Sequence, residues 1–268
     1  MRIIDVTLSE LRSGGIFVDQ SAAARWQELM LELGIDAVEV APASPGESEN
    51  LPRLVGFGDA LLHSGYRALF ADLRRREPEP ELSFTNEYGC ATALAVEWLM
   101  QGGRAVVCSF TGLGNLAPLE EVVMTMYVQQ AHFCGRISAL AGLRAMWLET
   151  FHQPVGRHKA VIGEQIFAVE SGIHVDGLMK DASLYEPFPP ECVGLRRKIV
   201  LGSHSGQGSL RLQCKLLGLD CAEDFLPLLL QSVHTSSRER ERSLTDEEFV
   251  LLHKRLFAES GHAYRQAG

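Results

Sequence analysis

The sequence predicts an α/β protein in which short parallel strands alternate with helices, followed by a mainly helical C-terminal subdomain. Two observations support this class. In the first half of the chain, β-type runs alternate with helix-type periodicity, which is typical of β/α units on a parallel sheet. Further on, helices are separated by Gly-rich and Pro-rich loops. We therefore expect a β/α region over residues 1–153 and C-terminal subdomains over residues 154–268.

Five runs in the first half have the length and the apolar or β-branched composition of strands. The first begins close to Met1, and the third is the weakest of the five. The expected strands are Arg2–Leu8, Ala37–Ala41, Ala68–Asp72, Leu82–Glu87 and Ala105–Phe110.

Helices are expected between these strands, where apolar residues recur at helical spacing. In the first helix, Gly34 follows the last apolar residue as a stop signal. Pro118 opens another helix, because proline fits the first helical turn. The apolar face of the first helix comprises Trp26, Leu29, Met30 and Leu33, and that of the helix after Pro118 comprises Leu119, Val122, Val123 and Met126. The expected helices are Ser21–Leu33, Leu51–His63, Thr92–Gln101 and the one that starts at Pro118.

A capping box marks a helix near the C-terminus. Thr245 is followed three residues later by Glu248, so that each side chain can bond the backbone N–H of the other residue. Apolar residues at helical spacing then form the stripe that we expect to be buried: Phe249, Leu252 and Leu256.

The strand count indicates a shortened, incomplete barrel of the TIM type. A closed parallel barrel has eight strands, each followed by a helix, in at least about 200 residues. This chain shows about five. An open barrel leaves strand edges and an apolar interior uncovered, which lowers stability unless another chain covers them. We therefore expect a partner chain or self-association.

The composition excludes some classes of function. The chain has 25 Lys and Arg against 34 Asp and Glu, a formal net charge of −9, whereas nucleic-acid binding needs a basic face. No apolar run approaches the length of about 18 residues that a membrane span needs. Asp5 lies so close to Met1 that the apolar region of a signal peptide has no room before it. The six cysteines form no C-x-x-C pair and are expected to be reduced. We expect a cytoplasmic protein that binds neither nucleic acid nor membrane.

Several stretches along the chain match one known family. They are Asp5–Leu8, Val38–Val40, Gly112–Gly114 with Ala117–Met124, Ser171–Leu178, Leu184–Phe188 and Leu201–Gly206. Together they resemble the homocitrate synthase/2-isopropylmalate synthase family, and residues 163–206 resemble the nitrogen-fixation type of homocitrate synthase. The resemblance implies a (β/α)8 barrel, shortened here by roughly three β/α units between the second strand and Leu82, and small C-terminal subdomains. It also implies condensation of acetyl-CoA with a 2-oxo acid at a divalent metal.

The departures from the family pattern fall on its metal site. The opening family motif, D-T-T-L-R-D-G-x-Q, contains an arginine for the oxo-acid carbonyl and an aspartate for the metal, but Ser9 and Glu10 stand there. In the H-x-H-N-D strand, Ser83 and Thr85 replace both imidazole ligands, and Thr111 replaces an asparagine ligand. Neutral hydroxyls are weak substitutes for the ligands of Mg²⁺, Mn²⁺ or Zn²⁺. We therefore expect no metal or other cofactor in this chain, and a divalent metal in a partner subunit.

The proton-handling residues of the family are retained. In the family, the histidine of G-I-H and a tyrosine eleven positions later reach the active site of the neighbouring subunit and remove a proton from the acetyl methyl group. The resemblance assigns these roles to His174 and Tyr185. Imidazole suits the role because an unperturbed pKa of about 6.5 leaves much of it as free base at neutral pH. Glu170 is expected to orient the imidazole, and His204 and Ser205, in the counterpart of G-K-H-S-G, are expected to support substrate binding.

Simpler interpretations and rival functions remain open. His174 could be a surface histidine in a Gly-bounded loop, or could pair with Asp176 at a metal, although a third ligand is not in view. The pattern of losses resembles the omega subunit of two-subunit homocitrate synthases, which would act in trans on an alpha-type barrel. The alternatives are a non-catalytic regulatory or assembly paralogue, and a stand-alone acyl-CoA condensing enzyme with an altered metal site.

Overall fold

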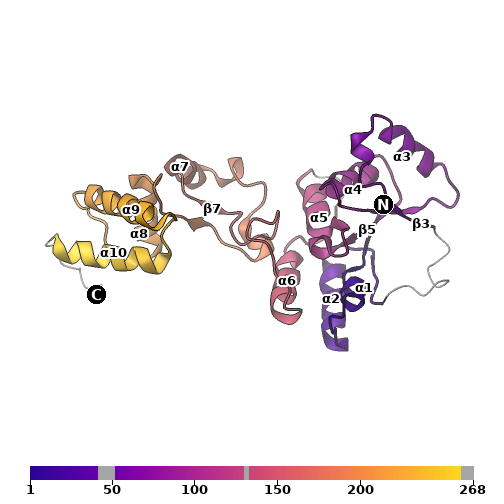
Figure 1. Cartoon of the computed structure of the whole chain (residues 1–268), viewed down its shortest axis with the longest axis horizontal. Helices are drawn as coiled ribbons and strands as arrows, with labels where there is room; N and C mark the ends of the chain where they lie inside the picture. Colours follow the sequence, from indigo (N-terminus) through magenta and orange to yellow (C-terminus); the bar gives the residue numbers. More distant parts are fainter. Residues whose placement is uncertain (42–51, 130–132, 261–268) are drawn as a thin grey trace. The chain divides into compact units, whose positions relative to one another are not determined.

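The computed structural model describes residues 1–41, 52–129 and 133–260, which form two compact units (Figure 1). Unit 1 comprises Met1–Ile166 and Pro190–Leu195, and unit 2 comprises Phe167–Pro189 and Arg196–Gly268. The division lies further along the chain than the expected boundary at residues 153/154, because residues 154–166 are bound to unit 1. Within this segment, the carbonyl of Ile162 accepts a hydrogen bond of 2.9 Å from Nε of Arg144.

Unit 1 is built on a parallel sheet of six strands. These are β1 Arg2–Asp5, β2 Ala37–Val38, β3 Arg53–Gly56, β4 Glu81–Phe84, β5 Ala105–Ser109 and β6 Ala117–Pro118. The strand order is β2-β1-β5-β4-β3, with β6 paired to β5, and every pair of neighbours is parallel. In this register Ile4 of β1 lies opposite Ala37 of β2 and Val107 of β5. The prediction of an α/β protein with a parallel sheet is therefore confirmed.

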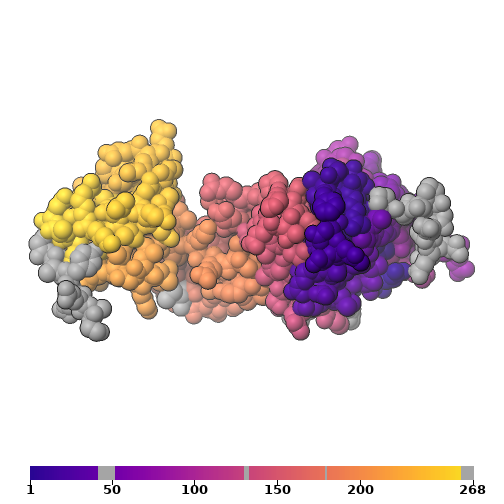
Figure 2. All heavy atoms as spheres, turned by 90° about the horizontal axis from the view of Figure 1, so that it is seen from below, coloured from indigo at the N-terminus to yellow at the C-terminus, as the bar shows by residue number. Residues whose placement is uncertain are grey.

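Helices pack around this sheet. They are α1 Thr7–Ser13, α2 Gln20–Glu32, α3 Tyr66–Arg74, α4 Ala91–Met100, α5 Leu119–Val128 and α6 Ala139–Ala145. The expected apolar faces of α2 and α5 are buried. α2, in indigo, packs beside α6 (Figures 1 and 2). The ring of Trp26 on α2 also contacts Phe110 and Phe151 at centroid distances of 5.5 and 5.4 Å, so that aromatic packing fixes α2 against the end of β5.

Two expected elements were wrong, and three strands end three residues earlier than expected: β1 at Asp5, β2 at Val38 and β4 at Phe84. The helix expected over Leu51–His63 is instead strand β3 and a 3₁₀ turn at Ala60–Leu62, with residue 51 outside the described residues. β3 is extended because it pairs along its whole length with β4. The strand expected over Ala68–Asp72 lies within helix α3, whose Phe70 and Leu73 are buried one turn apart. Periodicity does not separate strand from helix in such short apolar runs.

The first strand is shorter than expected because a carboxylate ends it. β1 stops at Asp5, and α1 begins two residues later at Thr7. Oδ1 of Asp5 accepts a hydrogen bond of 3.0 Å from the backbone N–H of Thr7, which satisfies a donor of the first helical turn.

Unit 2 is mainly helical, as expected. It contains the short parallel pair β7 Ala168–Val169 and β8 Lys198–Ile199, and the helices α7 Gly172–Lys180, α8 Gln207–Leu216, α9 Leu226–Arg240 and α10 Asp246–Glu259. The capping box of Thr245 and Glu248 is present at the start of α10, and the expected stripe of Phe249, Leu252 and Leu256 is buried. Among the described residues, no helix combines the length and the hydropathy needed to cross a membrane.

Candidate functional site

His174 and Tyr185 lie against each other in unit 2. His174 is on α7, and Tyr185 follows a 3₁₀ turn at Ala182–Leu184. Their ring centroids are 5.6 Å apart and the ring planes are at 89°, an edge-to-face contact. Both side chains are exposed, Tyr185 to 44%. The eleven-residue spacing in the sequence is thus a direct contact in space, and both rings remain accessible from outside the unit.

Local structure dictates this contact. Asp181 accepts a hydrogen bond of 3.0 Å from the N–H of Ser183 and so caps the short turn that brings Tyr185 back over α7. The phenol ring then lies on the backbone of α7 at Gly177, where a Cβ atom would overlap its Cζ and Oη atoms. Gly177 is therefore required by a close approach, one turn from His174, rather than by its own backbone angles.

The surface beside the pair is apolar. Ile173, which precedes the histidine, is 81% exposed, and Leu184, which precedes the tyrosine, is 77% exposed. On the other side of α7, Asp176 forms an exposed ion pair of 2.7 Å with Lys180, so the carboxylate that was considered as a second metal ligand is engaged within its own helix.

Glu170 is connected to His204. One of its carboxylate oxygens accepts a hydrogen bond of 3.0 Å from the backbone N–H of His204, and the carboxylate lies directly over Gly202, where a Cβ atom would overlap it. The structure therefore places Glu170 as a support of the loop that carries His204. Its orienting role toward His174 stays a prediction.

Hydrogen bonds of the buried Ser205 stabilise the loop that carries His204. Ser205 is only 4% exposed, and its Oγ accepts a hydrogen bond of 2.9 Å from the N–H of Gly202. Nε2 of His234 on α9 lies 2.9 Å from the carbonyl oxygen of Ser205. His204 by contrast is exposed. A ligand would therefore meet the side chain of His204, with Ser205 fixing the loop behind it; substrate binding by both residues stays a prediction.

The four positions that correspond to metal ligands in the family lie in unit 1. The carboxylate of Glu10 packs on Gly114, and Ser83 on β4 is buried at 2% exposure. Oγ1 of Thr85 lies close to Gly58. Thr111 has a positive φ of 61° and donates its N–H to a carboxylate oxygen of Glu120 at 2.8 Å. Within residues 1–41, 52–129 and 133–260, no three His, Cys, Asp or Glu side chains are grouped closely enough to hold a metal ion.

Sequence reasoning missed a buried charged cluster at the start of α5. Glu120 is fully buried, and Nζ of Lys159 lies 3.1 Å from its Oε1 and also pairs with Glu121. Burial raises the pKa of Glu120, which the charge of Lys159 only partly offsets. The pKa of Lys159 is lowered by burial, but the two carboxylates outweigh this and raise it overall. The available signal was the pair of glutamates directly after Leu119, inside an otherwise apolar helix.

A second missed group is Asp5. It is completely buried, and its Oδ2 accepts a hydrogen bond of 2.8 Å from Nε1 of Trp26. Burial raises the pKa of Asp5 to about 6, although the hydrogen bonds from Thr7 and Trp26 lower it. Asp5 belongs to the D-V-T-L stretch that carries the family resemblance, and its visible task here is to join β1, α1 and α2.

Comparison with known proteins bears on this arrangement. Residues 161–241, which include His174, Tyr185 and His204, match the family model described as homocitrate synthase post-HMGL domain-like. The omega subunit of homocitrate synthase from Clostridium pasteurianum is 31% identical over 171 residues, covering 63% of this chain and 48% of that protein. A 2-isopropylmalate synthase from Methylobacterium nodulans is 32% identical over 240 residues, covering 82% and 45%. Homocitrate synthase AksA from Methanothermobacter thermautotrophicus is 32% identical over 200 residues, covering 73% and 51%.

The parallel β/α sheet and the matched C-terminal unit define the class: an α/β protein related to synthases. The chain belongs to the family of homocitrate synthases and 2-isopropylmalate synthases. It spans about half the length of the relatives it matches.

Proposed function

We propose that this chain is the subunit of a two-chain homocitrate synthase that supplies His174 and Tyr185 to the metal-containing barrel of an alpha-type partner. The reaction would be the condensation of acetyl-CoA with 2-oxoglutarate. The observation that carries the proposal is the edge-to-face contact of the two rings on the surface of unit 2, beside exposed apolar side chains. A pair that serves its own chain would be enclosed, whereas a pair that serves a neighbour has to protrude.

In the proposed step, the imidazole of His174 removes a proton from the acetyl methyl group, with Tyr185 positioning the ring. The methyl carbon then bonds to the keto carbon of the oxo acid, and hydrolysis of the thioester releases CoA. In the partner, a divalent metal would supply Lewis-acid stabilisation of the oxo-acid carbonyl. In this chain the corresponding positions hold Glu10, Ser83 and Thr85, a weak donor set for such an ion.

The strand order of unit 1 supports this proposal, because it is the order expected for a barrel that lacks three consecutive β/α units. In a closed eight-stranded barrel each strand lies between its sequence neighbours, and the last lies beside the first. Removal of the third, fourth and fifth strands would leave the order 2-1-8-7-6. The observed order β2-β1-β5-β4-β3 has the same cyclic arrangement, with the gap between β2 and β3.

An ion-pair cluster spans this gap. Arg53, the first residue of β3, bonds both oxygens of Glu39, which follows β2, at 2.5 and 3.1 Å. The same guanidinium bonds Glu81 of β4 at 2.9 Å. β2 and β3 are the two edges of the sheet, so side chains of the edges can meet only if the sheet is strongly curved. We interpret these ion pairs as a polar closure, that is, as side-chain contacts that join the two edges of the sheet in place of the missing strands.

The test is reconstitution. The purified chain is mixed with an alpha-type subunit that carries the intact H-x-H-N-D barrel, and free CoA thiol is measured with acetyl-CoA and 2-oxoglutarate. We expect turnover only with both chains, and a loss of 10²–10⁴-fold on His174→Ala, the usual contribution of a general base. His158→Ala, at another exposed histidine, is the matched control and should leave the rate unchanged.

Two other outcomes would replace the proposal. A complex whose activity is insensitive to His174→Ala would identify a regulatory or assembly paralogue. Turnover by the isolated chain with stoichiometric metal would identify a stand-alone condensing enzyme.

A further inference from the structure

A pocket outside the candidate site lies between α9 and α10. Its volume of about 360 Å³ is within the range of small-molecule sites. It is formed where the two helices meet at the loop that joins them, which contains Leu244. Its lining combines two arginines with three leucines: Arg240 on α9, Leu244 in the loop, and Leu251, Leu252 and Arg255 on α10, together with the polar Ser236 and Glu248.

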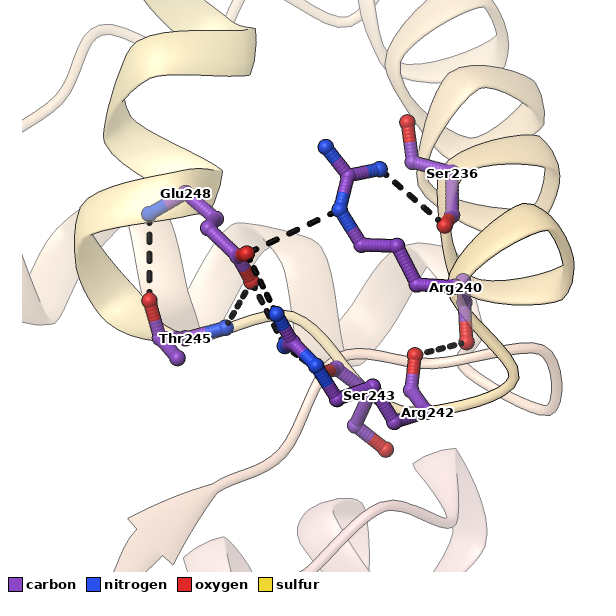
Figure 3. A network of polar contacts seen from close by, with 7 residues as sticks. Ser236, Arg240, Arg242, Ser243, Thr245 and Glu248 are labelled. Carbon is purple, nitrogen blue, oxygen red and sulfur yellow. Dashed lines mark hydrogen bonds and ion pairs between the residues drawn. The ribbon is translucent and has the colours of Figure 1, made fainter.

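The only carboxylate of the lining is already neutralised. Glu248 accepts two hydrogen bonds from Arg242, at 2.7 and 2.8 Å, and one of 2.9 Å from the N–H of Thr245 (Figure 3). The hydrogen bonds from Arg242 and Thr245 lower the pKa of Glu248 to about 2. Glu248 is therefore ionised at neutral pH, and its charge is balanced by a residue that does not line the pocket.

The lining therefore has two positive charges, on Arg240 and Arg255, against the single negative charge of Glu248. Arg240 approaches Glu248 only at 3.6 Å, through Nε, and donates from Nη1 to the carbonyl of Ser236 at 3.2 Å (Figure 3). Arg255 lies two turns of α10 beyond Glu248 and forms no ion pair with any residue in the described part of the chain. In a chain whose formal net charge is −9, this pocket is a local positive site.

Apart from Ser236, the rest of the lining is apolar. Leu244 and Leu252 are buried and form its floor, while Leu251 is 69% exposed at its rim. A ligand that satisfies both halves needs an anionic head for the guanidinium groups and a short apolar body for the leucines.

We propose that this pocket binds a small amphiphilic organic anion, with its carboxylate or phosphate on Arg240 and Arg255 and its aliphatic part on the leucines. The two helices and the loop supply all the contacts, so the site requires neither the partner subunit nor the condensation reaction.

The competing interpretation is structural. Arg240 is the last residue of α9, where a cation stabilises the helix dipole. Arg255, one helix away, does not share that role, so it is the residue that separates the two interpretations. Its substitution should also leave folding intact, because it is exposed.

The test is isothermal titration calorimetry of the full chain with four probes: hexanoate, hexyl phosphate, hexan-1-ol and inorganic phosphate. We expect saturable binding of hexanoate, hexyl phosphate or both, at least tenfold tighter than binding of hexan-1-ol or inorganic phosphate, and weaker as salt is raised. A preference between hexanoate and hexyl phosphate identifies the anionic head. Arg255→Gln should weaken binding at least fivefold, whereas Arg238→Gln, an exposed arginine of α9 outside the pocket, should not.

Four results would contradict the proposal. Hexan-1-ol that binds as tightly as hexanoate, inorganic phosphate that binds as tightly as hexyl phosphate, or no saturable heat with any probe would overturn the proposal. So would an unchanged affinity in the Arg255→Gln variant.

Discussion

Two pairs of polar side chains, one in each unit, lie in opposite environments. In unit 1, Asp5 and Glu120 are fully buried and surrounded by donors from several elements. In unit 2, His174 and Tyr185 touch each other but lie at the surface. Buried polar groups whose partners come from the same chain stabilise a fold, whereas exposed groups stay available to another molecule. The contrast indicates a structural role for Asp5 and Glu120, and it leaves His174 and Tyr185 available for the chemistry that we propose.

Among variants that leave His174 and Tyr185 themselves unchanged, the largest expected loss of activity is at Gly177. A methyl group in Gly177→Ala would overlap the phenol ring of Tyr185 and push it away from His174. We expect the reconstituted activity to fall at least tenfold, corresponding to about 1.4 kcal/mol of transition-state stabilisation, while the circular dichroism of the chain is unchanged. The displaced ring should also shift the tyrosine signals in a ¹H–¹³C NMR spectrum, which requires no partner.

Gly208→Ala is the matched control for this change. Gly208 is also a helical glycine of unit 2, and a Cβ atom there would meet nothing within 4 Å. It should leave both the activity and the NMR spectrum as they are. Equal losses from the two variants would mean that the helices of unit 2 tolerate no substitution of this kind. The loss at Gly177 would then say nothing about a role of His174 and Tyr185.

The next effect concerns pH and Asp5. The rise of its pKa from 3.8 to about 6 corresponds to about 3 kcal/mol at 1.36 kcal/mol for each pKa unit. Because the folded-state pKa is raised, this contribution to stability is fully present below pH 3.8 and is lost as the pH rises through 6. Relative to Asp5→Asn, the wild type should lose about 2 kcal/mol of unfolding free energy between pH 4.5 and 7.5.

Urea unfolding followed by tryptophan fluorescence measures this difference, since all three tryptophans lie in unit 1. Only the difference between the two proteins is diagnostic, because burial also raises the pKa of Glu120 in the same unit. Parallel pH profiles for wild type and Asp5→Asn would show that burial does not raise the pKa of Asp5 in the folded protein.

An effect of similar size is expected at the ion pairs between the two edges of the sheet. Arg53→Met leaves Glu39 and Glu81 without their shared cation and should lower the unfolding free energy by about 1–3 kcal/mol. A double-mutant cycle with Glu39→Gln isolates the contact across the gap, and we expect a coupling of about 1 kcal/mol. Arg25→Met, in an exposed pair with Glu28, is the control and should cost about 0.5 kcal/mol or less. A coupling near zero would remove the polar closure from the description of unit 1.

The sequence predicted those features that depend on local pattern. The apolar faces of α2 and α5 and the capping box of α10 were all visible as spacings, because each is set by neighbours within one or two turns. The strand β3 and the helix α3 were not, because short apolar runs take the structure that distant partners impose, here the pairing with β4 and the burial of Phe70.

In the candidate site, too, some contacts could be predicted from the sequence and others could not. The resemblance to the family implied that His174 and Tyr185 act together, and the structure shows that their rings are in contact. The link between Glu170 and His204 and the pair of Glu120 and Lys159 join residues 34 and 39 positions apart. No local pattern encodes such contacts, so they required the structure.

The smallest expected effect tests whether unit 2 is stabilised locally. In Thr245→Ala, the N–H of Glu248 loses its acceptor at 3.3 Å, which should cost about 1 kcal/mol. Hydrogen exchange detected by mass spectrometry should show faster exchange at the start of α10, whereas tryptophan fluorescence should show unit 1 unfolding as before. Thr245→Ser keeps the hydroxyl and should restore protection, and Thr235→Ala, an exposed mid-helix threonine of α9, should change neither readout. A loss that reached the tryptophans of unit 1 would show that the two units unfold together, and the division of labour between them would then have no counterpart in their stability.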